Sequence, residues 1–574
     1  MLDPVSQERA RPRWSRRLAA VGAAGVLVAG LVVAGAPGAS AAPEPARATV
    51  DADVYTALAD GPDEFFVYLA QTADLSAAAT LDSKLAKGTH VFGQLTRTAR
   101  TSQAPLRAML DARGVEYTPF WIANVLLVTG DRALVDELAA RPDVARIAPN
   151  RQVPLPEPVT TSPDGDNGIQ AVEWGVANIN ADDVWNQFNV RGEGIVVANI
   201  DTGVQHNHPA LVNQYRGTAT GSHDYNWFDP AGVCVVGVPC DNNGHGTHTM
   251  GTMVGDDGGS NQVGVAPRAQ WIAAKGCESN FCTEGSLLAS GQWVLAPTRI
   301  DGSDADPAMA PDTVNNSWGG GRGDTWYQAT INSWINAGIF PMFSAGNSGP
   351  ACNTANSPGD NIPAYAVGAY DINNTIASFS SRGPSGVSSS EIKPNVSAPG
   401  VAVRSSVPIN SYANFSGTSM ASPHAAGVVA LVWSAAPDLV GDIAGTRAVL
   451  DQTARNVGAT GCGGSTEDNN IFGEGRIDAL AAVTLATGGG PPDPGVVADF
   501  TFECSRSGGA RTCSFDGSPS TGDIVTFSWN FDDGSTGSGA VVTHTYQGGR
   551  SRDVTLTVAD GDGGTDSITR SVTP

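Results

Sequence analysis

Three short segments of the sequence carry an aspartate, a histidine and a serine in settings that suit nucleophilic catalysis. Asp201 follows an apolar run, His245 lies among small residues in NGHGTHT, and Ser419 lies in GTSMASPH ahead of an apolar stretch. A serine hydroxyl is a weak nucleophile at neutral pH and needs an adjacent base. Histidine can take the proton and return it to a leaving group, while a buried carboxylate fixes the imidazole tautomer and stabilises the imidazolium. These residue types predict acyl transfer if the fold brings them together.

Each of these residues also has a simpler interpretation. Asp201 could be a turn residue after a strand, and Ser419 could serve only as a helix N-cap. His245 and His248 are three residues apart and could bind zinc, which would make the protein a metal-dependent hydrolase. The sequence has no H-E-x-x-H motif and no obvious third ligand, so we expect His248 to be a packed neighbour. His424, five residues after Ser419, is expected to be structural as well.

The elements that must position these residues alternate between apolar, strand-like runs and helical stretches. We expect strands at 194–200, 269–274, 313–316 and 339–344, and helices at 419–435 and 444–452. This rhythm over residues 169–486 predicts an α/β fold with a parallel sheet flanked by helices. Functional residues gather at the carboxyl ends of strands in such sheets, which is where Asp201 is expected to lie.

The motifs resemble those of the subtilisin superfamily of serine proteases, the subtilases, over residues of about 170–486. The resemblance rests on IDTGV around Asp201, on NGHGTHT and GTSMASPH, and on the order Asp, His, Ser along the chain. The segments NNSWGG, AGIFPMFSAGN and GTSMASPH are most similar to the bacillopeptidase F branch of that superfamily. The resemblance implies a subtilisin-like serine endopeptidase with Asp201, His245 and Ser419 as its catalytic triad.

The resemblance also implies roles for two further segments. FSAGNSG looks like the family's oxyanion-hole loop, in which the Asn347 amide and the Ser419 backbone N–H would stabilise a tetrahedral oxyanion. NNSWGG looks like the family's substrate-binding strand, so Ser317, Trp318 and Gly319 are expected to contact an extended substrate. No cofactor is required for this chemistry. Structural calcium is possible, as in other subtilases, but no ligand set can be assigned to it.

The N-terminal part has the organisation of a secreted precursor. Residues 1–41 have a basic start, an apolar stretch and a small-residue end, Ala39-Ser40-Ala41, which predict a cleaved signal peptide; the alternative is a retained membrane anchor. Residues 42–168 resemble a subtilase propeptide, with an α+β core at 64–150. There we expect strands at 65–69 and 121–128, helices at 75–110 and 131–140, and an exposed linker at 153–168 where the chain is cut.

The C-terminal part is separate and rich in strand-like runs. Residues 487–495 form a Gly/Pro-rich linker, and residues 496–574 resemble a PKD-like β-sandwich through WNFDDG and HTY. The acidic loop with Asp560, Asp562 and Asp566 lacks EF-hand spacing, so a solvated turn is favoured over a calcium site.

Composition limits the partners and the compartment. The chain has 57 acidic and 33 basic residues, a net charge of −24, which does not suit nucleic-acid binding. The eight cysteines follow residue 230, and an even number behind a secretion signal predicts disulfides, with neighbours pairing as Cys234–Cys240, Cys277–Cys282 and Cys504–Cys513. Cys352 and Cys462 then pair by elimination. We expect an extracellular enzyme that acts on proteins or peptides, has no membrane partner after processing, and has its own propeptide as intramolecular inhibitor and chaperone. The non-catalytic alternative is an adhesion protein on an inactive protease scaffold.

Overall fold

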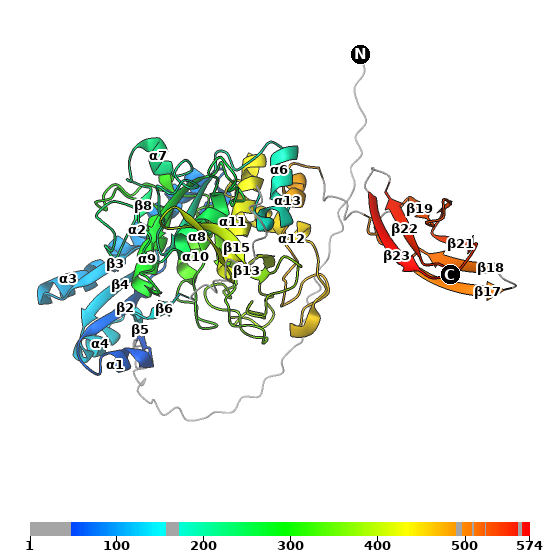
Figure 1. The fold of residues 1–574 in the computed structure, drawn as a ribbon. Coiled ribbons are helices and arrows are strands. Elements are labelled where there is room, and N and C mark those ends of the chain that lie inside the picture. The colour runs from blue at the N-terminus through cyan, green and yellow to red at the C-terminus, as the bar shows by residue number, and fades with distance from the viewer. Residues whose placement is uncertain (1–47, 156–171, 490–495, 508–509, 523, 561–564) are drawn as a thin grey trace, which may run out of the picture. The chain divides into compact units, whose positions relative to one another are not determined.

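A computed structural model describes residues 48–155, 172–489, 496–507, 510–522, 524–560 and 565–574 (Figure 1). The expected signal peptide therefore lies outside the described residues, as does most of the expected linker at 153–168. In the part of the chain that is described, no helix is long and apolar enough to cross a membrane.

The central element is a seven-stranded sheet in the order β14-β13-β12-β11-β7-β9-β8, in which all neighbouring strands are parallel. Its strands are β7 (Val196–Asp201), β8 (Trp227–Phe228), β9 (Gln270–Lys275), β11 (Thr313–Asn316), β12 (Phe340–Ser344), β13 (Tyr365–Tyr370) and β14 (Val396–Pro399). The four predicted strands are therefore confirmed to within two residues at each end. The parallel α/β architecture is confirmed as well.

Helices cover both faces of this sheet (Figure 1). One hydrophobic cluster joins the sheet to residues of α8 (His245–Val254), α11 (Thr418–Ala435) and α13 (Ala479–Ala486). A second cluster joins it to residues of α9 (Glu284–Leu295) and α10 (Gln328–Asn336). The shorter helices are α5 (Trp174–Asn178), α6 (Ala181–Gln187), α7 (Arg216–Thr220) and α12 (Ile443–Thr453), and β15 (Val403–Val407) pairs with β16 (Ser411–Phe415).

The N-terminal unit, drawn in blue and cyan in Figure 1, is a five-stranded sheet with helices. It contains β1 (Thr49–Val50), α1 (Ala52–Ala57), β2 (Asp63–Leu69), α2 (Lys84–Ser102), α3 (Ala104–Arg113), β3 (Tyr117–Phe120), β4 (Val125–Gly130), α4 (Arg132–Ala139) and β5 (Val144–Pro149). Two predictions were partly wrong. The helical stretch 75–110 is divided at 81–83 and 103, where Ser83 caps α2 and Pro105 starts α3. Residues 121–124 form a turn between β3 and β4, because Asn124 adopts a left-handed backbone.

The start of the expected linker is also structured, which corrects the sequence prediction for residues 153–155. β6 (Gln152–Pro154) pairs antiparallel with β10 (Phe281–Thr283), and Leu155 is buried. The prolines made VPLP look like a linker. An edge strand tolerates proline, however, because only one of its sides must donate hydrogen bonds.

The C-terminal unit consists of two sheets, β17-β18-β21 and β20-β19-β22-β23. Its strands are β17 (Thr501–Ser507), β18 (Ala510–Asp516), β19 (Thr526–Asn530), β20 (Thr536–Ser538), β21 (Val541–Tyr546), β22 (Arg552–Ala559) and β23 (Thr565–Val572). Buried aromatic rings of Phe500, Phe515 and Trp529 pack between them, as in a β-sandwich. All four disulfides join the cysteines that the sequence paired, including Cys352 with Cys462.

Candidate active site

The carboxyl ends of three neighbouring strands bring the predicted site residues to one edge of the central sheet. Asp201 is the last residue of β7, and Ser317 directly follows β11. Since Ile200 pairs with Asn316, Asp201 and Ser317 occupy adjacent positions on neighbouring strands. Asn347 lies three residues beyond the end of β12, which pairs with the other side of β11.

His245 is the first residue of α8, and its side chain is hydrogen-bonded to that of Asp201. Its Nδ1 lies 2.7 Å from Asp201 Oδ1, and both side chains are 1% exposed. The helix starts here because Gly244 adopts a left-handed backbone and Asp241 accepts the Gly244 and Thr247 backbone N–H groups at 2.8 and 2.9 Å. An ionised carboxylate can only accept, so Nδ1 carries the proton and Nε2 is left as an acceptor.

The Asp201 carboxylate is held from both sides. Its Oδ1 also accepts the Thr202 backbone N–H at 2.7 Å, and Oδ2 accepts the Thr249 hydroxyl at 3.3 Å. Burial alone would lower the pKa of His245. The negative charge of Asp201 and its hydrogen bond outweigh burial, so the pKa of His245 is raised above its ordinary 6.5.

Ser419 is the second residue of α11 and is locked to Ser317 by two reciprocal contacts. The Ser317 hydroxyl donates to the Ser419 carbonyl at 2.9 Å, and the Ser419 hydroxyl donates to the Ser317 carbonyl at 3.2 Å. His245 Nε2 is buried and has no hydrogen-bond partner among the described residues. A serine–histidine hydrogen bond is therefore not formed here, because the Ser419 hydroxyl is directed to the Ser317 carbonyl.

Asn347 is oriented by Thr418 at the start of α11. The Asn347 side-chain oxygen accepts both the Thr418 backbone N–H and its hydroxyl, each at 2.9 Å. The amide nitrogen must then point elsewhere. A Cβ built on Gly417 would lie 3.3 Å from this nitrogen and 3.6 Å from the Ser419 backbone nitrogen, so both donors border one small space. Two N–H donors converging at a helix N-terminus can stabilise a developing oxyanion.

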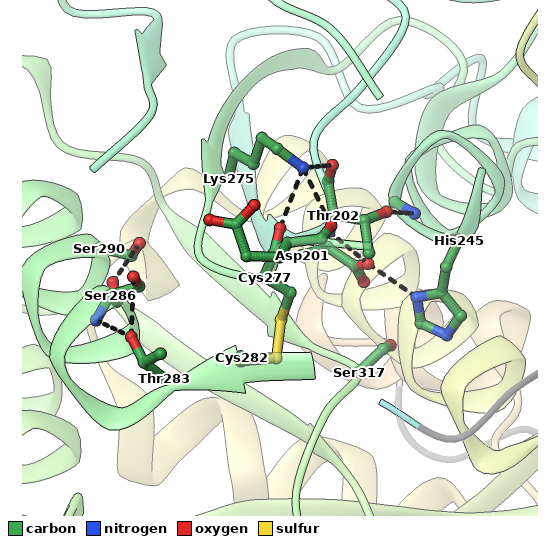
Figure 2. Close-up of a disulfide and its surroundings, with 12 residues drawn as sticks. Asp201, Thr202, His245, Lys275, Cys277, Cys282, Thr283, Ser286, Ser290 and Ser317 are labelled. Carbon is green, nitrogen blue, oxygen red and sulfur yellow. Dashed lines mark hydrogen bonds and ion pairs between the residues drawn. A yellow bond between two sulfur atoms is a disulfide. The ribbon is translucent and has the colours of Figure 1, made fainter. Parts of the chain in front are cut away.

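Lys275 is a buried lysine next to Asp201, at the end of β9, that the sequence analysis missed (Figure 2). Its Nζ donates to the Thr202 carbonyl at 2.7 Å, the Asn242 side chain at 2.8 Å, and the carbonyls of Cys277 and Glu278 at 3.0 and 3.1 Å. Burial lowers its pKa, although nearby carboxylates act to raise it. Lys275 thus joins the segment after Asp201, the segment before His245 and the Cys277–Cys282 loop.

A chain of hydrogen-bonded polar side chains extends from β7 and β11 to the helices α8 and α11. Asn199 donates to the Thr249 hydroxyl at 2.8 Å, Asn315 donates to Asn199 at 3.3 Å, and the Ser422 hydroxyl donates to Asn315 at 2.7 Å. This chain connects the elements that carry Asp201, His245 and Ser419. Its signal in the sequence was the unusual number of polar residues in otherwise apolar strands.

The predicted substrate-binding residues differ in their exposure and surroundings. Trp318 as a whole is 1% exposed, and its ring packs edge-on against Tyr327 and Phe343, so the ring offers no surface to a ligand. A Cβ on Gly319 would meet the Ser357 carbonyl at 2.6 Å, and Gly320 lies beside Val153. The backbone of this segment therefore borders the chain's own N-terminal unit.

The two histidines of the zinc alternative make other contacts. His248 Nε2 lies 3.0 and 3.1 Å from the carbonyls of Val403 and Ala413, so this nitrogen carries a proton and is not a metal ligand. Its ring stacks on Phe415, and His424 Nδ1 contacts the Met420 carbonyl at 2.8 Å. No cluster of three or more metal-binding side chains occurs in the part of the chain that the structure describes.

The chain is similar to known peptidases. The profile of the Subtilase family matches residues 192–475, and that of the PKD domain matches residues 497–573. Subtilisin DY of Bacillus licheniformis is 34% identical over 316 residues, which cover 54% of this chain and 99% of that protein. The chain belongs to the subtilase family.

Other subtilases agree with this assignment. Bacillopeptidase F of Bacillus subtilis (strain 168) is 38% identical over 446 residues, or 73% of this chain, although these cover only 30% of that longer protein. Subtilisin E of the same strain is 28% identical over 413 residues, covering 71% of this chain and 94% of the relative. The chain is therefore a subtilisin-family serine peptidase with a PKD domain, as its motifs indicated.

Proposed function

We propose that the protein is a secreted serine endopeptidase that works through a Ser419 acyl-enzyme. The observation that carries this proposal is the buried Asp201–His245 pair, 2.7 Å apart, at the same sheet edge as Ser419. His245 Nε2 removes the Ser419 proton as the hydroxyl attacks the peptide carbonyl, and Asp201 stabilises the imidazolium. His245 then protonates the leaving amine, and water releases the acyl group by the reverse proton transfers.

The oxyanion of each tetrahedral intermediate would lie between Asn347 and the Ser419 backbone N–H. The space bordered by both donors supports this role, as does the fixed orientation that Thr418 gives to Asn347. Ser317–Gly319 would contact the substrate mainly through the backbone, since Trp318 is packed in the core. No metal or cofactor takes part in the proposed steps.

The N-terminal unit is proposed to be a propeptide that inhibits the enzyme and assists its folding. β6 extends the edge of β10, and Leu155 N–H donates to the Asn280 carbonyl at 2.9 Å. The residues that precede β10 lead back to Cys277, which lies next to Asp201. The Cys277 N–H donates to the Asp201 carbonyl at 3.0 Å. The antiparallel β6 therefore runs toward the catalytic pair, as an inhibitory product would. Residues 1–41 are proposed to direct secretion, and the PKD domain to dock or space substrates.

The test is self-processing of the purified precursor. The Ser419→Ala protein should keep its N-terminal unit, whereas Ser434→Ala, a matched change on the same helix, should mature like the wild type. Cleavage is followed by intact-mass measurement. A purified Ser419→Ala protein that matures at the wild-type rate would refute both the nucleophile and the self-processing mechanism.

A further inference from the structure

Arg151, directly before β6, pairs with two acidic side chains of the catalytic unit, Glu284 and Asp324, which we call the acidic pocket. Its Nη2 lies 2.6 Å from Glu284 Oε1 and 2.6 Å from Asp324 Oδ2, and its Nε donates to Glu284 at 2.9 Å. Glu284 begins α9 and Asp324 lies in the loop before α10, so two distant segments supply the carboxylates. A guanidinium bridging two carboxylates is a specific, charge-assisted contact.

The pocket depends on a cation from outside the catalytic unit. The Glu284 side chain is only 3% exposed, and its carboxylate hydrogen bonds among the described residues all come from Arg151. Burial raises the pKa of Glu284 to about 7, although Arg151 acts to lower it. If Arg151 leaves with the N-terminal unit, the Glu284 carboxylate loses every donor that the described residues give it, and another cation or water must take their place.

The backbone around Arg151 indicates how a basic side chain of a substrate would reach Glu284. The Glu284 N–H donates to the Arg151 carbonyl at 3.0 Å, so the β6–β10 pairing continues through this residue. Side chains of a strand alternate between its two faces. Leu155 is buried, Val153 is half-buried against the same cluster, and Gln152 and Pro154 are exposed. Arg151, Val153 and Leu155 therefore share the face that docks, and this strand leads toward Asp201.

We propose that Glu284 and Asp324 form a specificity pocket for arginine or lysine in extended peptide substrates. This inference rests on the proposed peptidase activity and names its substrate class. Substrates would carry a basic residue upstream of the scissile bond, followed at alternate positions by two apolar residues, as Arg151, Val153 and Leu155 do. The alternative is that the pocket serves only to hold the N-terminal unit.

The experiment compares internally quenched peptides that copy residues 148–162, cut by the processed enzyme. One peptide keeps Arg151, a second has Lys there, and a third has Gln. A fourth exchanges Arg151 and Gln152, which preserves composition and charge but puts arginine on the exposed face. We expect kcat/KM to be about tenfold or more higher for the Arg peptide than for the Gln or exchanged peptides, as charge-assisted bonds predict.

Variants then assign this preference to the pocket. The Arg-to-Gln ratio of kcat/KM should fall to about one to three in Glu284→Gln and should also fall in Asp324→Asn. Asp304→Asn, an exposed acid with 67% of its side chain accessible, should retain the full ratio. Equal cleavage of the Arg and Gln peptides by the wild type, or a preference that survives in both pocket variants, would overturn the inference. If the enzyme cuts none of the peptides, the proposed peptidase activity fails first, and this inference falls with it.

Discussion

Replacing Asp201 by asparagine should separate the charge of this carboxylate from its role in fixing the histidine tautomer. Asp201 Oδ1 accepts from both Thr202 N–H and His245 Nδ1, each at 2.7 Å. An asparagine that keeps its oxygen there retains both bonds, and its amide nitrogen then faces the Thr249 hydroxyl, which can accept. The opposite orientation would place an N–H against the Thr202 N–H. We therefore expect the proton to stay on Nδ1 while the negative charge is lost.

The expected loss follows from the buried ion pair that forms in the transition state. Charge centres separated by about 4 Å attract by about 4 kcal/mol at an effective dielectric constant of about 20. That energy corresponds to a decrease of roughly 10³-fold in kcat/KM. The pH dependence should change as well. His245 acts as a base only when neutral, so wild-type activity should fall as the pH drops through its raised pKa. Without Asp201 the effect of burial dominates, so the pKa and the acid limb should move below 6.5.

The assay is kcat/KM for a peptide substrate over a range of pH, using wild type, Asp201→Asn and the exposed control Asp304→Asn. The Asp201→Asn protein should process itself slowly, so its precursor is first cut by wild-type enzyme. This wild-type enzyme carries an affinity tag, through which it is removed before the assay. Thermal unfolding verifies that each variant is folded. A folded Asp201→Asn protein that loses less than tenfold, or whose acid limb does not move, would refute this reasoning.

Three further predictions concern the frame around the site. Asn347→Ala should lower kcat by about 10²–10³, as the loss of such a donor does in subtilisin, with little change in KM; a threefold effect or less would argue against an oxyanion role. Lys275→Met removes the donor that four acceptors share, of which the Thr202 and Cys277 carbonyls are buried, and should lower the free energy of unfolding by roughly 2–4 kcal/mol in urea; an unchanged midpoint would contradict this. Cys352→Ser opens a bridge between residues 110 apart in sequence and should cost about 2–5 kcal/mol in the same assay, and reductant should then lower the stability of the variant less than that of the wild type, because only the three shorter disulfides are left to reduce; an equal loss on reduction would contradict this.

The sequence predicted the α/β core because its strands are short apolar runs that differ clearly from the helical stretches. It predicted the edge of the sheet where Asp201 lies for the same reason, since parallel strands place their carboxyl ends together. Three disulfides followed from the close spacing of their cysteines, and the Cys352–Cys462 pair followed by elimination. Residues 153–155 were misjudged because composition does not show that a proline-containing segment has a strand edge to join.

Other features depend on tertiary contacts that no local pattern encodes. Lys275 lies in an apolar strand, and only the meeting of three loops around its Nζ reveals its partners. The rotamer of Ser419, which points at the Ser317 carbonyl, is equally invisible in GTSMASPH. The pairing of Arg151 with Glu284 joins residues 133 positions apart. The sequence motifs thus predicted the reactive residues, whereas the folded chain shows which contacts hold their side chains.

The central claim is that Ser419 is the nucleophile activated by His245. Treatment of the processed enzyme with a serine-directed phosphonate, followed by peptide mass mapping, tests it most directly. We predict one adduct, on Ser419, whose formation matches the loss of activity and is nearly abolished in His245→Ala. Full inactivation with no adduct on Ser419, or an enzyme that stays active with Ser419 fully labelled, would contradict the account.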